Sequence, residues 1–233
     1  CNQACLDHTF SGKISSCLVN PKACFETELI STKALNKKSV AVVGAGPAGM
    51  SAAIEAAERG HEVTLFEKAQ AVGGQLNLAK MVPGKEEFWG LVDWFEEMLN
   101  TSGVDVRLGK TVTSADVMGF DEVIVATGVV PRDPKIKGQE KNNVVSYAEV
   151  LNGEGKIGQK VAVVGAGGIG FDVSEYLVHE SRSDYKQIEI PDWMKEWGVG
   201  DPEQTAGGLA ESGPRPEEAT RQVTLMQRKK QKL

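Results

Sequence analysis

The sequence predicts an α/β fold with two Rossmann-like dinucleotide-binding units that follow a short cysteine-rich segment. Two observations predict the units: a run of β-favouring residues leads into a glycine-rich turn at 44–49, and the same pattern returns at 165–170. A helix is expected after each turn. The third observation is that all four cysteines lie within the first 24 residues.

The composition is that of a globular chain and argues against several classes of partner. The chain has 233 residues, 41% of them hydrophobic, which suggests one or two domains with a substantial core. A net charge of −6 argues against nucleic acid or a membrane surface as the partner. The longest uncharged stretch, 39–54, contains glycines and a proline and is too short to span a membrane. The start shows no signal peptide, which favours a cytoplasmic location.

Both ends of the sequence suggest a piece of a longer protein. The chain begins at Cys1 rather than at a methionine, and it stops directly after an expected strand. We therefore expect further sequence on both sides.

The first glycine turn has the residue types that a pyrophosphate site requires. The strand 40–43 precedes the turn, and a helix is expected over 48–57. In such turns the first glycine permits a tight bend, the second lets the backbone approach a phosphate, and the third lets the helix pack on the strand. The helix N-terminus offers N–H groups to the phosphates. The candidate residues are Gly44, Gly46, Pro47, Ala48 and Gly49.

An acidic residue follows this turn at the expected distance. The predicted strand 62–66 ends at Glu67, about 20 residues after the glycines, where a carboxylate can accept hydrogen bonds from both ribose hydroxyls. This ordered series is much more specific than an isolated glycine pattern.

The cysteines have the spacing C-x3-C-x11-C-x6-C. Disulfides are unusual in a cytoplasmic protein, and zinc sites usually contain paired C-x2-C motifs. An iron–sulfur cluster needs four thiolates, of which Cys1, Cys5 and Cys17 could supply three. The spacing favours a metal or cluster, and it leaves open whether Cys24 is a ligand or a buried thiol.

Between the two glycine turns the sequence predicts core elements and two further turns. Paired glycines precede Gln75, the helix 88–99 has an apolar stripe for the core, and an alternating strand is expected over 104–108. A buried strand at 121–125 leads into a turn that contains Thr127 and Gly128, followed by a proline-containing linker.

The second unit repeats the first with an interruption. Its strand, 161–164, leads into Gly165, Gly167 and Gly170, and a helix is expected to about Val178. The polar stretch 180–220 reads as an insertion, helical near 192–197, with two tryptophans expected to anchor its packing. The delayed strand, 222–226, is followed by Arg228 and Lys229. Cations there favour a 2′-phosphate and hence NADPH, unless they form a solvated basic tail.

These motifs together resemble the bacterial NADPH-dependent 2,4-dienoyl-CoA reductases, which belong to the flavoprotein group of trimethylamine dehydrogenase and old yellow enzyme. The resemblance rests on the stretches CNQACLD and SCLVNP and on the first glycine turn. In the family, an FMN-containing TIM barrel precedes a 4Fe-4S segment, an FAD domain and an NADPH domain. The resemblance implies an α/β, two-dinucleotide-binding-domain flavoprotein, with a cluster segment at 1–36, part of the FAD domain at 37–132 and a truncated NADPH domain at 133–233.

The resemblance also implies roles for individual residues. Cys1, Cys5 and Cys17 would be cluster ligands, the first ligand would lie upstream, and Cys24 would not be one. The positions that would contact FAD between the two glycine turns are Gly74, Gln75, Lys85, Val112 by its main chain, Thr127 and Gly128.

The implied function is electron input. Electrons would pass from NADPH to FAD and the 4Fe-4S cluster, and in the full protein to FMN and a 2,4-dienoyl-CoA of unsaturated fatty acid oxidation. No residue of this chain is expected to act as a catalytic acid or base. The alternatives are an amine dehydrogenase of the same group, and a stand-alone FAD and iron–sulfur electron-transfer subunit like the small subunit of glutamate synthase.

Overall fold

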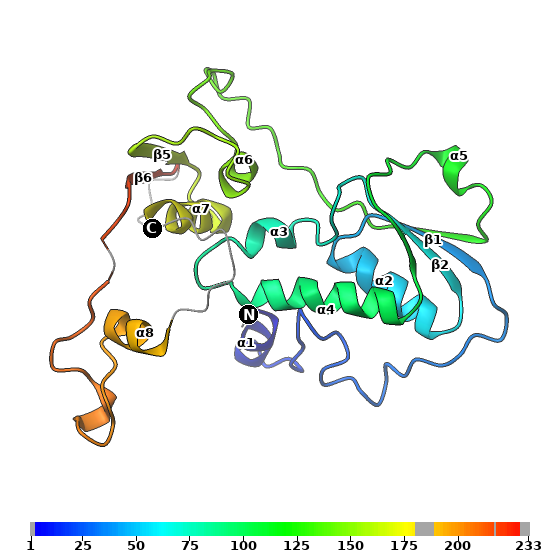
Figure 1. Cartoon of the computed structure of the whole chain (residues 1–233), viewed down its shortest axis with the longest axis horizontal. Coiled ribbons are helices and arrows are strands. Elements are labelled where there is room, and N and C mark those ends of the chain that lie inside the picture. Colours follow the sequence, from blue (N-terminus) through cyan, green and yellow to red (C-terminus); the bar gives the residue numbers. More distant parts are fainter. Residues whose placement is uncertain (1–2, 180–188, 217, 229–233) are drawn as a thin grey trace. The chain divides into compact units, whose positions relative to one another are not determined.

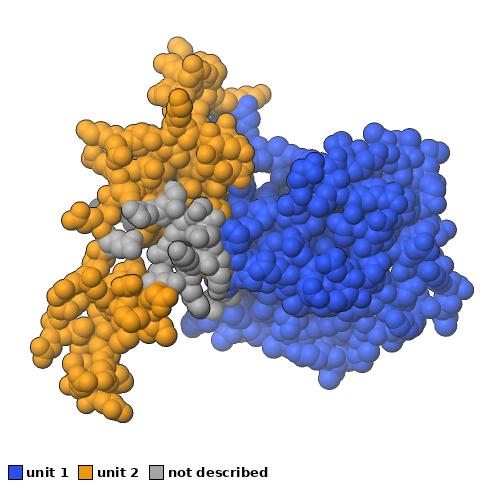
Figure 2. Space-filling view, in the orientation of Figure 1, with its two compact units in different colours: residues 1–80, 87–134 blue, residues 81–86, 135–233 orange. Residues whose placement is uncertain are grey.

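The computed structural model describes residues 3–179, 189–216 and 218–228, which form two compact units. Unit 1 contains Cys1–Lys80 and Glu87–Pro134, and unit 2 contains Met81–Glu86 and Lys135–Leu233 (Figure 2). Each unit has a parallel sheet with helices, so the predicted α/β class is confirmed.

Unit 1 contains a four-stranded parallel sheet in the order β3-β2-β1-β4. Its two central strands, β1 and β2, are labelled in Figure 1. Its strands are β1 (Ser39–Val43), β2 (Glu62–Phe66), β3 (Asp105–Arg107) and β4 (Glu122–Val125). The strands end level with one another, because Val43 lies beside both Phe66 and Val125. The turns that follow β1, β2 and β4 therefore meet at one edge of the sheet.

The core of unit 1 lies between this sheet and the helices α2 (Pro47–Glu58) and α4 (Glu87–Thr101). Val42 and Leu65 of the strands are fully buried with Met50 of α2, and Leu99 of α4 joins them. The predicted apolar stripe of α4 is confirmed, since its buried residues are Val92, Phe95 and Leu99. The shorter helices are α1 (Gln3–Phe10), α3 (Leu76–Ala79) and α5 (Ser114–Val117).

The expectation that the strand at 121–125 is buried was wrong. All four residues of β4 are exposed, including Val125 at 72%. The physical reason is position: β4 is an edge strand that pairs only with β1 in the described part of the chain.

Unit 2 contains the second predicted strand–turn–helix. The strands β5 (Lys160–Val164) and β6 (Gln222–Met226) are parallel, with Val161 beside Val223. Helix α7 (Gly168–Val178) packs on them, and α6 (Tyr147–Leu151) packs on α7. The long separation of β5 and β6 in sequence therefore does not prevent them from pairing.

The described part of the insertion forms a small closed loop. It contains α8 (Ile190–Trp197), which ends at a left-handed Gly198, and the 3-10 turn η1 (Ala206–Gly208). An antiparallel bridge joins Val199 to Leu209. The expectation that the two tryptophans anchor the packing of the insertion was wrong. Trp193 and Trp197 pack on each other, with ring centroids 6.3 Å apart, and both remain exposed.

Among the helices in the described residues, none combines the length and the apolar character needed to cross a membrane.

Candidate functional site

Three turns converge at the carboxyl edge of the unit 1 sheet. The Gly73 N–H donates to the Ala45 carbonyl at 2.8 Å, which joins the turn after β2 to the first glycine turn. The Gln75 side-chain amide donates to the Val129 carbonyl at 3.1 Å, which joins the turn after β2 to the segment after β4. The predicted residues Gly74, Gln75, Thr127 and Gly128 are thus brought to the first glycine turn.

The glycines of the first turn fall into two physical classes. Gly44 has φ +106°, and a Cβ there would lie 2.5 Å from the Ala126 carbonyl oxygen. A Cβ on Gly49 would overlap the Gly44 carbonyl oxygen. Gly46 has nothing within 4 Å of its Cβ position. The fold itself therefore requires Gly44 and Gly49, whereas Gly46 leaves open space at the surface of the turn.

The N-terminus of α2 opens onto the same space. Gly46 is the N-cap, Pro47 begins the helix, and no side chain caps the helix end. Pro47 and Ala48 are exposed. An uncapped helix end presents backbone N–H groups and the positive end of the helix dipole, which favour a bound anion such as a pyrophosphate.

Glu67 lies directly beside this turn and is 9% exposed. One carboxylate oxygen accepts the Ala45 N–H at 2.7 Å, and the other accepts the Ala69 N–H at 2.9 Å. A carboxylate has about four lone-pair sites, so both oxygens retain capacity to accept ribose hydroxyls. The Lys110 N–H donates to the Glu67 carbonyl, which brings the chain that leads to the half-buried Val112 to this edge. The open Gly46, the uncapped helix and this carboxylate fit a dinucleotide.

The second glycine turn repeats the geometry of the first. Gly165 has φ +120°, a Cβ on Gly170 would overlap the Gly165 carbonyl oxygen, and Gly167 has nothing within 4 Å of its Cβ position. Gly167 is the N-cap of α7, again without a side-chain cap. This turn therefore also fits a dinucleotide pyrophosphate.

The cations predicted to select NADPH follow β6. Arg228 lies two residues beyond the strand and is exposed. Lys229 lies outside the described residues. Their interaction with a 2′-phosphate stays a prediction.

Lys85, which the resemblance assigns to FAD, has a partner within unit 2. Its ammonium lies 2.6 Å from the Asp172 carboxylate on α7, and both side chains are about one-third exposed. Sequence reasoning missed Asp172, because the two residues are separated by 87 positions and no spacing connects them.

The cysteine segment brings backbone N–H groups to one thiol. The Asn20 N–H donates to the Cys17 sulfur at 3.4 Å, and together with the Val19 N–H it lowers the pKa of Cys17. The thiolate is the form of cysteine that binds a metal, so this environment is compatible with a role for Cys17 as a metal ligand. Cys5 is half-buried on α1. The described residues contain no group of three or more potential ligands, and Cys1 lies outside them.

Cys24 differs from Cys17 in its surroundings. It is exposed and has φ +66°, so the alternative that it is a buried thiol was wrong. The expectation that it is not a ligand stays a prediction.

The two glycine classes predict opposite results for two alanine substitutions. Gly46→Ala should leave the free energy of unfolding of the FAD-free protein nearly unchanged but weaken FAD binding by roughly 1–3 kcal/mol, because the methyl group occupies ligand space. Gly49→Ala should lower the free energy of unfolding by a similar ~1–3 kcal/mol, because its methyl group meets the Gly44 carbonyl. Denaturant unfolding and FAD titration measure the two effects. Equal losses of stability in both variants would contradict the distinction.

Comparisons with known proteins agree with this geometry. The family model for pyridine nucleotide-disulphide oxidoreductases matches residues 38–201. The chain is 42% identical over 188 residues to an NADH oxidase from Thermoanaerobacter brockii, a match that covers 77% of this chain and 29% of that protein. It is 36% identical over 196 residues to a metal reductase from Desulforamulus reducens, covering 82% and 29% of the two.

Among solved structures, the chain is similar to a 2-naphthoyl-CoA reductase in complex with 2-naphthoyl-CoA. The TM-score is 0.74 at 26% identity, and the match covers 97% of this chain and 39% of that one. The chain spans under a third of the length of the two curated relatives.

Proposed function

The chain belongs to the pyridine nucleotide-disulphide oxidoreductase family, and on that premise we propose that it is the electron-input part of an NADPH-dependent 2,4-dienoyl-CoA reductase. The family and the fold indicate a flavin-dependent oxidoreductase with FAD and NAD(P)H. The observation that carries the finer proposal is the likeness to 2-naphthoyl-CoA reductase, which extends over 97% of the chain and so reaches into the cysteine segment. That enzyme is named for a CoA thioester, the substrate class proposed here.

In this proposal each glycine turn binds one nucleotide. The first turn, with Gly46, the N-terminus of α2 and Glu67, would hold the pyrophosphate and ribose of FAD. The second turn, with Gly167 and the N-terminus of α7, would hold NADPH, and Arg228 and Lys229 would bind its 2′-phosphate. Glu67 would repel such a phosphate, so the two turns differ in charge where the ribose would lie.

The cysteine segment would hold the 4Fe-4S cluster through Cys1, Cys5, Cys17 and a ligand upstream of this chain. When bound, FAD takes a hydride from NADPH and releases electrons singly, and the cluster carries single electrons. The residues of this chain would bind and orient these groups, and the backbone N–H groups that lower the pKa of Cys17 favour the thiolate, which is the form that binds a metal.

The proposal is tested with the full-length protein under anaerobic conditions. NADPH should bleach the flavin absorbance, and a 2,4-dienoyl-CoA should then restore it with consumption of one NADPH per dienoyl-CoA. Bleaching without restoration by the dienoyl-CoA would contradict the proposed substrate. Bleaching by an amine in the absence of NADPH would instead support an amine dehydrogenase.

A further inference from the structure

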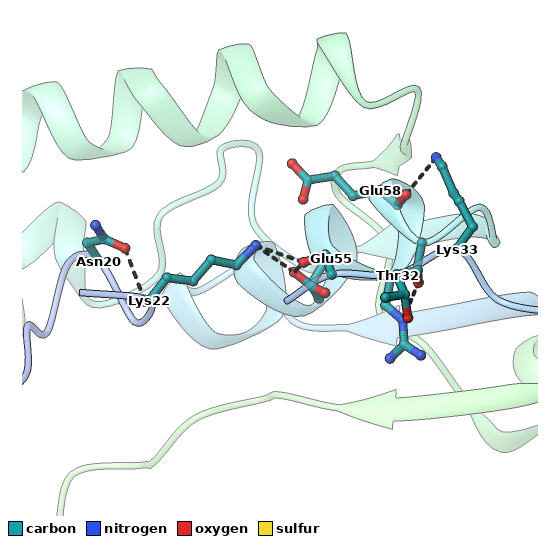
Figure 3. Close-up of polar contacts among 8 residues, drawn as sticks. Asn20, Lys22, Thr32, Lys33, Glu55 and Glu58 are labelled. Atoms are coloured by element: carbon teal, nitrogen blue, oxygen red, sulfur yellow. Dashed lines mark hydrogen bonds and ion pairs between the residues drawn. The ribbon is translucent and has the colours of Figure 1, made fainter. Parts of the chain in front are cut away.

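Residues 22–34, here called the strap, lead from the part of the chain that contains Cys5 and Cys17 toward β1, and they contact the C-terminal end of α2 (Figure 3). Lys22 and Ser31, which bound the first ten residues of the strap, both contact one carboxylate. The Lys22 ammonium donates to the Ser31 hydroxyl at 2.7 Å, and this hydroxyl donates to Glu55 Oε2 at 2.8 Å. The Lys22 ammonium also lies 3.4 Å from the same oxygen. The hydrogen bond between Lys22 and Ser31 thus closes the loop, and Glu55 attaches this loop to α2.

The last three residues of the strap, 32–34, contact the end of α2. The Lys33 ammonium donates to the Glu58 carbonyl at 2.7 Å, and the Ala34 N–H donates to the Arg59 carbonyl at 2.8 Å. In Figure 3 the Glu58 carboxylate points away from Lys33, whose hydrogen bond is with the main chain. Glu55 and Glu58 lie about one turn apart on the same helix, and of these two carboxylates only that of Glu55 takes part in the described strap contacts. The Arg59 side chain at the helix end also donates to the Thr32 carbonyl, at 3.2 Å.

Helix α2 carries the strap and the first glycine turn on one rigid element. Glu55 lies about 14 Å along the helix axis from the Gly46 N-cap, at 1.5 Å per residue. Lys22 follows Cys17 by only five residues in the sequence. The point at which Lys22 is held on α2 therefore limits where Cys17 can lie relative to the turn.

We propose that Glu55 is a positioning residue, which fixes the cysteine segment on α2 through Lys22 and Ser31 and thereby sets the distance for electron transfer between FAD and the cluster. The inference rests on the proposed function. In the proposed function this transfer would move one electron from reduced FAD to the oxidised cluster, with NADPH as the source of electrons and no bond made or broken in the transfer itself. Because the Lys22 and Glu55 side chains are about 40% exposed, their ion pair adds little global stability, and its effect is local.

The test compares Glu55→Gln with Glu58→Gln in the full-length holoenzyme. Hydrogen exchange in peptides that cover the strap should become about tenfold faster in Glu55→Gln, because removal of the charged hydrogen bond permits local opening. Exchange in Glu58→Gln should stay within about twofold of the wild type, because that carboxylate is outside the strap contacts. Lys22→Glu combined with Glu55→Lys should restore slow exchange, since a carboxylate and an ammonium again meet at Ser31.

Rapid mixing with NADPH measures the rates at which the flavin and the cluster are reduced. The ratio of these rates distinguishes a role in positioning from a role in stability alone. In Glu55→Gln the bleaching of the flavin should keep its rate, while the later bleaching of the cluster should slow at least threefold. Unchanged exchange in Glu55→Gln would overturn the anchor. Faster exchange with unchanged cluster bleaching would overturn the positioning role. If the wild-type full-length protein as purified contains no iron, the proposed cluster is overturned, and the exchange data still decide whether Glu55 anchors the strap.

Discussion

Neutralising Arg228 and Lys229 together should raise the Kd for NADPH strongly. Each charged hydrogen bond to the 2′-phosphate that is lost should raise the Kd by roughly 10- to 150-fold, which corresponds to about 1.5–3 kcal/mol. The Kd for NADH should change little, because that nucleotide has no 2′-phosphate. Arginine meets a phosphate with two parallel N–H bonds, and lysine adds a point charge. Titration of the full-length protein with each nucleotide measures the difference, which should shrink at high salt as the attraction is screened.

Two lysines at the opposite end of the unit 2 sheet supply the matched control. Lys156→Gln with Lys160→Gln also removes two positive charges, from exposed positions before and at the start of β5. This control should leave the Kd for both nucleotides within about twofold, because the charges lie beyond the reach of a screened phosphate. Equal weakening of NADPH and NADH binding in the Arg228 and Lys229 variant would show that these cations are a solvated tail.

Cys17→Ser in the full-length protein should remove essentially all iron and its visible absorbance, whereas Cys24→Ser should retain both. The backbone N–H groups at Cys17 favour a thiolate, and a serine hydroxyl stays protonated and binds iron poorly. Iron analysis and absorbance spectra measure the result, with FAD content as the internal control for folding. Cys5→Ser should behave like Cys17→Ser.

Two outcomes would contradict this assignment of ligands. Full iron content in Cys17→Ser would exclude Cys17 as a ligand. Loss of iron in Cys24→Ser with normal FAD content would make the exposed Cys24 a ligand and would conflict with the family resemblance.

The sequence predicted the elements whose signals are local. Residues 62–66 and 222–226 form strands with the expected bounds, because β-favouring runs between turn residues identify strands without knowledge of their neighbours. The exposure of β4 could not be predicted in this way, since it depends on which strand lies beside it. The same holds for Trp193 and Trp197, whose residue type indicates burial but whose helix leaves them exposed.

The candidate site was predictable to a similar extent. The glycine pattern locates both turns and Glu67, because spacing along the chain carries the information. It cannot show that a methyl group at Gly49 meets protein whereas one at Gly46 meets open space. Nor can it show the pairing of Lys85 with Asp172, which arises only when distant segments fold together.

The assignment of Met81–Glu86 to unit 2 has a consequence for dissecting the protein into parts. The chain passes between the units three times, after Lys80, after Glu86 and after Pro134, so no single cut separates them. During synthesis Lys85 emerges well before Asp172, its partner on α7, and this ion pair forms only when the later unit folds. A fragment that begins at Lys135 lacks Lys85 and therefore leaves the Asp172 carboxylate without its counter-ion.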